Sequence, residues 1–246
     1  LMDRGERKMA IRPEMTPTLA RMVAGKLQEL PKPIRWFSIP NLYRYERPQR
    51  GRLREHWQLN VDVLGGNTQL ADVEIVTLAL ELFASLKGEK FFSIHVNNRR
   101  LMDHFFYQVL KLNEEQGHQV SKAIDARAKL KPEEYQAWLA KIGVSAGQIA
   151  ELDQFLSSNF DQILQKYPCQ GTEELGVLFS HLKEKVSSGQ LKFDPTIMRG
   201  FDYYTGLVFE GYDISPENRR ALFGGGRYDN LVGLFGKNKL PGIGFG

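Results

Sequence analysis

The chain has 246 residues, of which 42% are hydrophobic and 25% are charged, and its formal net charge is +4. These values are typical of a soluble globular protein with one large domain, or one domain that carries an insertion. The most apolar stretch, residues 73–86, contains Glu74 and Glu81 and is shorter than the ~20 residues of a membrane span. We therefore expect no membrane partner, and a charge of +4 alone does not indicate a polyanionic one.

Cysteine and histidine usage argues against a metal centre. The single cysteine, Cys169, excludes an internal disulfide and a multi-cysteine zinc site. The histidines have no metal-ligand spacing along the chain. They are His56, His95, His104, His118 and His181. We therefore predict no zinc site and assign no residue as a metal ligand.

Residues 1–100 mix short strands, turns and helices. Aromatic and branched side chains at 35–39 and 43–45 predict two strands that meet at a turn around Pro40 and Asn41. Apolar residues at helical spacing predict an amphipathic helix at 72–86, with Asp72 near its N-terminus. Residues 91–96 then predict another strand.

Residues 101–188 have a different composition, dominated by Lys, Glu, Gln, Leu and Ala, and Pro132 marks a helix start. Helices are predicted at 101–112, 120–130, 133–142, 146–156 and 175–186. Residues 189–246 return to strands and glycine-rich turns, at 207–212, 224–226 and 242–246. The order predicts an α+β protein whose sheet domain, 1–100 and 189–246, is interrupted by an inserted helical module at 101–188.

The densest chemical feature lies at residues 42–64. The second half of this segment is predicted as a strand. Because side chains alternate across a strand, one of its faces is apolar and the other carries Gln58, Asn60 and Asp62. The apolar face can pack on a helix while the polar face lines a cleft. On the preceding strand, Arg44 and Glu46 likewise share a face.

The loop between these strands is rich in arginine. Together with the first strand it places five arginines within eleven residues: Arg44, Arg47, Arg50, Arg52 and Arg54. A basic loop is usually only a solvated surface. Because guanidinium groups suit bidentate phosphate binding and an ordered polar face lies beside them, the pattern favours a phosphate-handling site.

Three further segments allow both a structural and a functional interpretation. In residues 12–17, Glu14 and Thr16 stand in a turn before a helix, where capping is the simpler role. Residues 199–206 are either a strand opening with buried tyrosines or part of a site. Residues 223–229 contain three glycines, which form a hairpin turn or bring the backbone close to a ligand.

These segments together resemble one enzyme family. The run Tyr-Arg-Tyr-Glu-Arg-Pro-Gln-Arg-Gly-Arg-Leu-Arg-Glu at 43–55 resembles the second shared motif of class II aminoacyl-tRNA synthetases, specifically of the histidyl enzymes. Arg-Pro-Glu-Met-Thr at 12–16, Arg-Gly-Phe-Asp-Tyr-Tyr at 199–204 and Phe-Gly-Gly-Gly-Arg-Tyr-Asp at 223–229 resemble histidyl-tRNA synthetase segments. The resemblance implies a class II fold, a mostly antiparallel sheet flanked by helices. It also implies an aminoacyl-tRNA ligase that activates histidine with ATP and loads it onto tRNA for histidine.

The resemblance also assigns roles to residues. Arg44 and Arg199 are expected at the α-phosphate of ATP, as the catalytic pair. Histidine is expected to contact Glu14, Thr16, Gln58, Asp62, Tyr203, Tyr204 and Tyr228. ATP is expected to contact Arg44, Glu46, Arg52, Arg54 and His56, with Mg²⁺ on its β- and γ-phosphates. Many family members carry glutamate in place of Asp62, and the family usually has phenylalanine in place of His56.

The resemblance also implies that the protein is cytoplasmic and forms a homodimer. We expect the natural chain to continue at both ends, with a dimer-forming first motif before residue 1. After residue 246 we expect the arginine of a third motif, which begins at 241–246, and then an anticodon-binding domain. Whether residues 1–246 alone are active is therefore left open. Two alternatives share the fold: a regulatory histidine sensor, like the synthetase-derived subunit of ATP phosphoribosyltransferase, and a degenerate tRNA-binding domain. The enzyme is favoured by the joint presence of Glu14, Thr16, Arg44, Gln58, Arg199, Tyr204 and Tyr228.

Overall fold

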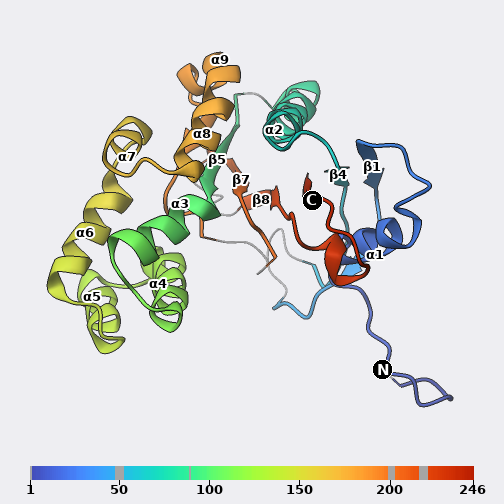
Figure 1. The fold of residues 1–246 in the computed structure, drawn as a ribbon, viewed down its shortest axis with the longest axis horizontal. Helices are drawn as coiled ribbons and strands as arrows, with labels where there is room; N and C mark the ends of the chain where they lie inside the picture. The colour runs from blue at the N-terminus through green and yellow to red at the C-terminus, as the bar shows by residue number, and fades with distance from the viewer. Residues whose placement is uncertain (1, 48–52, 89, 199–202, 216–220) are drawn as a thin grey trace.

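A seven-stranded sheet organises the fold in the computed structural model, which describes residues 2–47, 53–88, 90–198, 203–215 and 221–246 (Figure 1). In spatial order the strands are β1 (Ile34–Ser38), β4 (Asn60–Leu64), β9 (Gly242–Phe245), β8 (Ala221–Arg227), β7 (Leu207–Asp213), β5 (Phe92–Asn98) and β6 (Leu191–Phe193). Neighbours pair antiparallel except β5 and β6, which are parallel. A separate hairpin joins β2 (Asn41–Tyr43) to β3 (Glu55–Trp57). The predicted antiparallel sheet is confirmed.

Two helices pack near the β1–β4–β9 side of the sheet. Helix α1 (Thr16–Lys26) buries Leu19 and Val23 in an apolar cluster that includes Leu64 and Val232, which begins the short 3-10 helix Val232–Leu234. Helix α2 (Thr68–Ser85) contacts β4 and β9, and its Val76 belongs to the same cluster as Val63. The apolar face predicted for β4 therefore does pack on a helix.

Helix α2 begins four residues earlier than predicted. The Asn67 side chain accepts a hydrogen bond from the backbone N–H of Leu70 at 3.2 Å, which caps the helix N-terminus. Asp72, predicted near the start, is instead buried inside the helix and paired with Arg227 at 2.5 Å. The start of the helix is therefore set by the capping side chain of Asn67. This residue lies before the run of regularly spaced apolar residues, so their spacing alone does not reveal it.

Residues 99–187 form helices that gather on one side of the molecule (Figure 1). They are α3 (Arg99–Asp103), a π-helical turn (His104–Val109), α4 (Glu114–Ala126), a 3-10 turn (Arg127–Lys129), α5 (Pro132–Lys141), α6 (Ala146–Ser157), α7 (Phe160–Lys166), α8 (Gln170–His181) and α9 (Lys183–Ser187). Each of the five predicted helical segments overlaps one or more of these helices, and α7 was not predicted.

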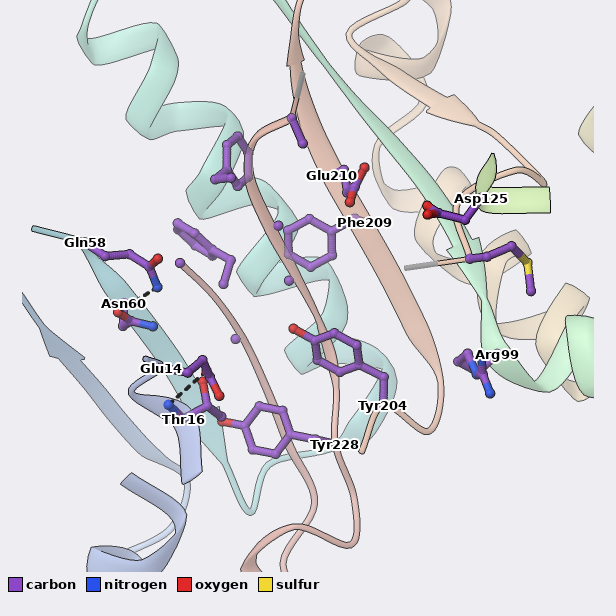
Figure 2. Close-up of a pocket in the computed structure, with 18 of the residues that line it drawn as sticks. Glu14, Thr16, Gln58, Asn60, Arg99, Asp125, Tyr204, Phe209, Glu210 and Tyr228 are labelled. Carbon is purple, nitrogen blue, oxygen red and sulfur yellow. Dashed lines mark hydrogen bonds between the residues drawn. The ribbon is translucent and has the colours of Figure 1, made fainter. Parts of the chain in front are cut away.

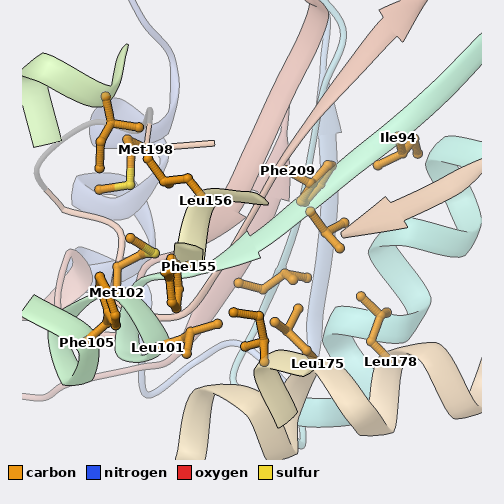
Figure 3. Packing of buried hydrophobic residues seen from close by; sticks show 14 of the residues in the cluster. Ile94, Leu101, Met102, Phe105, Phe155, Leu156, Leu175, Leu178, Met198 and Phe209 are labelled. Atoms are coloured by element: carbon orange, nitrogen blue, oxygen red, sulfur yellow. The ribbon is translucent and has the colours of Figure 1, made fainter. Parts of the chain in front are cut away.

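The helices and the sheet share one apolar core. Figure 3 shows Ile94 and Phe209 of the sheet together with Leu101, Phe105 and Leu175 of the helices, all members of one buried cluster. Helix α8 approaches α3 closely at Gly171, where an added Cβ atom would lie 2.4 Å from the backbone nitrogen of Leu101. The division of the chain at residues 100 and 188 stays a prediction, because this core crosses it.

The glycine-rich segments at 224–226 and 242–245 are strands β8 and β9, not the turns that their composition predicted. They pair with each other in the middle of the sheet, with Gly226 opposite Gly244. Within the described ranges, no helix has both the length and the apolar character needed to cross a bilayer.

Candidate functional site

A cavity of about 1060 Å³ lies between the sheet and the helices. Its walls come from β4, β7, β8 and β9, from the β2–β3 hairpin, and from α3 and α4. Figure 2 shows Gln58 and Asn60 on one side, Tyr204, Phe209 and Glu210 opposite them, and Asp125 farther away. The volume is that of a large small-molecule site.

Most of the predicted site residues that the structure describes line this cavity. They are Glu14, Thr16, Arg44, Glu46, His56, Gln58, Tyr204 and Tyr228. Asp62, Tyr203 and Arg54 stand outside the lining. Arg52 and Arg199, one of the two predicted catalytic arginines, lie outside the described residues.

Glu14 stands where the chain enters α1. Its Oε1 atom accepts the backbone N–H of Thr16 at 3.1 Å, and its Oε2 atom accepts the hydroxyl of Tyr203 at 3.2 Å. The first contact satisfies a free N–H group at the helix start, as the structural interpretation predicted. The same carboxylate borders the cavity, so it is held in a fixed place there. Tyr203 supports Glu14 from behind.

Arg44 ties the hairpin to the segment before α1. Its Nε atom donates to the carbonyl oxygen of Pro13 at 2.8 Å, and its backbone N–H donates to the carbonyl of Arg54 at 2.9 Å. A guanidinium nitrogen of Arg44 also donates to Oε1 of Gln58 at 3.5 Å. The nearby Arg54 turns away, with its guanidinium 4.9 Å from the ring centre of Tyr45 and its Nε atom donating to the carbonyl of Glu46.

Asp62 and Tyr228 form a buried pair. The Tyr228 hydroxyl donates to Oδ1 of Asp62 at 2.5 Å. Burial raises the pKa of Asp62 to about 7, although the hydrogen bond from Tyr228 opposes the rise. Burial and the neighbouring Asp62 raise the pKa of Tyr228 well above its usual value. Tyr228 reaches the cavity, and Asp62 lies behind it.

Glycines in β8 and β9 make room for these side chains. An added Cβ atom at Gly244 would lie 2.1 Å from Oδ1 of Asp62, and one at Gly242 would lie 2.4 Å from the Tyr228 ring. At Gly225 it would lie 2.4 Å from the carbonyl oxygen of Gly244. Strand packing therefore explains these glycines. Of the triplet, only Gly224 could carry a Cβ atom without a clash, since the nearest atom would lie 3.5 Å away, in ordinary van der Waals contact.

Several residues of the lining were not predicted from the sequence. Asn60 was placed on the polar face but given no role, and Glu210 is a carboxylate in an otherwise apolar stretch of β7, a signal that was available. Tyr212 donates its hydroxyl to Glu210. The far wall carries Arg99 and Asp103 of α3, and His118, Ser121, Lys122 and Asp125 of α4. No local pattern marks those helical residues.

The arrangement suits a zwitterionic ligand. A carboxylate, Glu14, lies near a guanidinium, Arg44, and hydroxyl groups of Tyr204 and Tyr228 lie deeper. Such a site can hold a cation and an anion side by side and read a polar side chain. In the part of the chain that the structure describes, no three His, Cys, Asp or Glu side chains converge as metal ligands do.

Comparisons with known proteins identify the family. A family model described as histidyl-tRNA synthetase matches residues 1–246. The histidine–tRNA ligase of Leptospira biflexa is 49% identical over 250 residues, which cover 100% of this chain and 57% of the relative. That of Haloarcula marismortui is 39% identical over 254 residues, or 99% and 57% of the two chains. The chain thus spans a little over half the length of these relatives.

Solved structures show the same fold. Histidyl-tRNA synthetase from Nostoc sp. PCC 7120 matches with a TM-score of 0.83 and 26% identity, over 95% of this chain and 56% of that one. A Bacillus halodurans protein described as an ATP phosphoribosyltransferase regulatory subunit/histidyl-tRNA synthetase matches with a TM-score of 0.82 and 25% identity, over 100% and 64%. The sheet and its flanking helices are those of a class II synthetase. By its sequence and its fold, the chain belongs to the histidyl-tRNA synthetase family.

Proposed function

We propose that this chain forms the amino-acid activation site of a histidine–tRNA ligase. The carboxylate of L-histidine attacks the α-phosphorus of ATP, which gives histidyl-adenylate and releases pyrophosphate. The 3′-terminal hydroxyl of tRNA for histidine then attacks the activated carbonyl and releases AMP. The observation that carries the proposal is the meeting of Glu14, Arg44 and Tyr228 around one cavity in a chain of this family.

Glu14 and Arg44 would hold the reacting end of histidine. Glu14 is fixed by Thr16 and Tyr203, so its carboxylate is oriented to receive the α-ammonium group. Arg44 would neutralise charge on the substrate carboxylate and the α-phosphate, with Gln58 beside it. No side chain needs to form a covalent bond, because positioning and electrostatic stabilisation supply the catalysis.

Tyr204 and Tyr228 would read the imidazole. Because Tyr228 donates its only hydrogen to Asp62, its hydroxyl oxygen is left as an acceptor for a ring N–H. Asp62 would then act on the ring through Tyr228 and not by direct contact. This arrangement accounts for an aspartate where many family members carry the longer glutamate.

ATP would lie along the hairpin, near His56 and Glu46, with Arg52, Arg54 and Arg199 assigned by family resemblance alone. Mg²⁺ is expected to arrive on the β- and γ-phosphates as part of the substrate. The described residues of the chain include no converging set of three metal-ligating side chains, so we assign it no protein ligand. By the same family relation, we propose a cytoplasmic homodimer as the natural form.

The test is histidine-dependent ATP–pyrophosphate exchange by the full natural protein. Arg44→Ala should lower the rate about a hundredfold, or roughly 3 kcal/mol, because it removes a guanidinium aimed at transition-state charge. Arg35→Ala, which removes an exposed arginine paired with Glu74 outside the cavity, is the matched control and should keep the rate. Unchanged exchange by folded Arg44→Ala would contradict the role of this residue.

A second candidate, a histidine sensor, is favoured by one observation. The Bacillus halodurans structure, whose description names a regulatory subunit as well as a synthetase, matches almost as well as the Nostoc enzyme. Histidine binding without exchange in the wild-type protein would support the sensor. Exchange would exclude both the sensor and a degenerate tRNA-binding domain.

A further inference from the structure

An amide nitrogen of Asn60 opens into the cavity. Asn60 lies on β4 between Gln58 and Asp62, and its side chain borders the cavity although only 2% of the residue is exposed. Figure 2 shows Asn60 at the start of this strand and Gln58 just before it, joined by a hydrogen bond. Family resemblance gives Asn60 no role.

The direction of that hydrogen bond follows from Arg44. A guanidinium can only donate, so Gln58 must present its Oε1 atom to Arg44. Its Nε2 atom then donates to Oδ1 of Asn60 at 3.2 Å. The orientation of both amides is therefore set by the network, which is how amide oxygen and nitrogen are told apart. Asn60 is left with Nδ2, a donor.

The Nδ2 atom has no hydrogen-bond partner among the residues that the structure describes. It is reached from the cavity beside Gly246, where an added Cβ atom would lie 2.5 Å from it and would cover it. Because Asn60 lines the cavity, an acceptor on a ligand can reach this N–H and form the hydrogen bond that the protein leaves unmade. Arg44 is the cation that begins the hydrogen-bond series Arg44–Gln58–Asn60. It polarises both amides and strengthens the Nδ2–H group of Asn60 as a donor.

We propose that Asn60 is a substrate-binding residue whose Nδ2 atom donates to an acceptor on the amino acid. The acceptor is a carboxylate oxygen or the unprotonated imidazole nitrogen, since Asn60 lies between Gln58 at the reacting end and the Asp62–Tyr228 pair at the buried end. This inference rests on the proposed function, because it takes histidine as the occupant.

The competing structural role is that Asn60 only orients Gln58. Asn60→Asp separates the two, because it keeps the oxygen that receives Gln58 and removes the donor at nearly equal volume. Asn60→Ala removes both and adds no charge. Asn238→Asp makes the same chemical change at an exposed site outside the cavity and is the control.

The measurements are histidine affinity by calorimetry and the KM values of histidine and ATP in pyrophosphate exchange, on the full natural protein. Asn60→Asp and Asn60→Ala should each weaken histidine binding at least tenfold and leave the KM of ATP within twofold. Circular dichroism and thermal melting identify a variant that fails to fold, and Asn60→Leu then replaces it, because leucine is neutral, is close to asparagine in size and has no donor.

Each result decides the proposal. Histidine affinity unchanged in Asn60→Asp but lost in Asn60→Ala would leave Asn60 as a positioning residue for Gln58 and overturn the donor role. A rise in the KM of ATP alone would overturn the assignment to the amino acid. With histidinol, which lacks the carboxylate, a penalty that persists in Asn60→Ala identifies the imidazole as acceptor, and one that disappears identifies the carboxylate. No histidine binding by the wild type would overturn the proposed function itself.

Discussion

Tyr228 on the chain after β8 and Asp62 on β4 form a hydrogen bond of 2.5 Å in which both partners are almost fully buried. The two residues are distant in sequence, and β9 separates their strands in the sheet. The pair reaches across β9 because Gly242 and Gly244 have no side chains. Removing Asp62 from water outweighs the hydrogen bond, so its pKa rises to about 7.

Asp62→Asn should stabilise the protein at alkaline pH more than at acid pH. The folded-state pKa of Asp62 is raised above its ordinary value of 3.8, so its stabilising contribution is complete below that value and is lost as the pH rises through about 7. Asparagine does not ionise and escapes this loss. The free energy of unfolding of the variant relative to wild type should rise between pH 4 and 8, by up to roughly 4 kcal/mol. Urea unfolding at both pH values measures it.

Glu81→Gln, at an exposed position of α2, is the control for this pH dependence. The free energy of unfolding of Glu81→Gln relative to wild type should not show the rise between pH 4 and 8 that is expected for Asp62→Asn. If the Asp62→Asn difference stayed constant from pH 4 to 8, Asp62 would not titrate in that range.

Gly244→Ala should displace Asp62. The new methyl group would lie 2.1 Å from Oδ1 of Asp62 and 2.5 Å from the carbonyl oxygen of Val61, so a side chain and a backbone must both shift. Overpacking of this kind costs about 1–3 kcal/mol. Thermal unfolding should show the loss, and histidine binding should weaken with it.

Gly147→Ala is the matched control, because nothing lies within 4 Å of an added Cβ atom there. This glycine is inside α6, where alanine is favoured by about 1 kcal/mol, so the control should be neutral or stabilising. Equal losses in both variants would show that the loss at 244 does not come from its contacts with Asp62 and Val61.

Sequence patterns predicted the elements that depend on local periodicity. Alternation placed Gln58, Asn60 and Asp62 on one face of a strand, and the structure brings the first two to the cavity and the third to Tyr228. Helical spacing located α2 within a few residues of its true bounds. These features follow from side-chain order along one segment, so no knowledge of the partners was required.

Features set by distant partners were not predictable in the same way. Glycine is a turn signal locally, yet Gly225 and Gly244 lie in central strands because neighbouring side chains and carbonyls take the space of a Cβ atom. Whether Arg54 faces the cavity or Tyr45 depends on how the hairpin sits against the rest of the chain. The short helix α7 has too few residues for its apolar period to stand out.

Arg227→Met should destabilise the protein strongly. Arg227 and Asp72 are both buried, with a nitrogen–oxygen distance of 2.5 Å, and Arg227 also pairs with Asp229 at 3.1 Å. Removing the guanidinium leaves the carboxylate of Asp72 buried and unneutralised, which costs about 3–5 kcal/mol. The double variant Asp72→Leu/Arg227→Met removes both charges. Its loss of unfolding free energy should be smaller than the sum of the losses of the two single variants. Urea unfolding of all four proteins gives the coupling energy.

The exposed pair Arg35–Glu74 provides the comparison, since its partners remain in water. The same cycle there should give a coupling much smaller than that of Arg227 with Asp72. Additive losses at the buried pair would show that its charges do not depend on each other.

Tyr135→Phe should leave the stability unchanged or raise it by about 1–2 kcal/mol. The Tyr135 hydroxyl is buried in the helical part of the chain with no hydrogen-bond partner among the described residues, and burial raises its pKa to about 12. Phenylalanine keeps the ring, which packs against Arg127, and removes the desolvated hydroxyl. Tyr167→Phe makes the same change where the hydroxyl does donate, to Glu151 at 2.6 Å, and should destabilise by about 1–2 kcal/mol. Thermal melting of the two variants compares them directly, and a fall in Tm for Tyr135→Phe as large as that for Tyr167→Phe would mean that the Tyr135 hydroxyl is bound in solution, for example by a buried water.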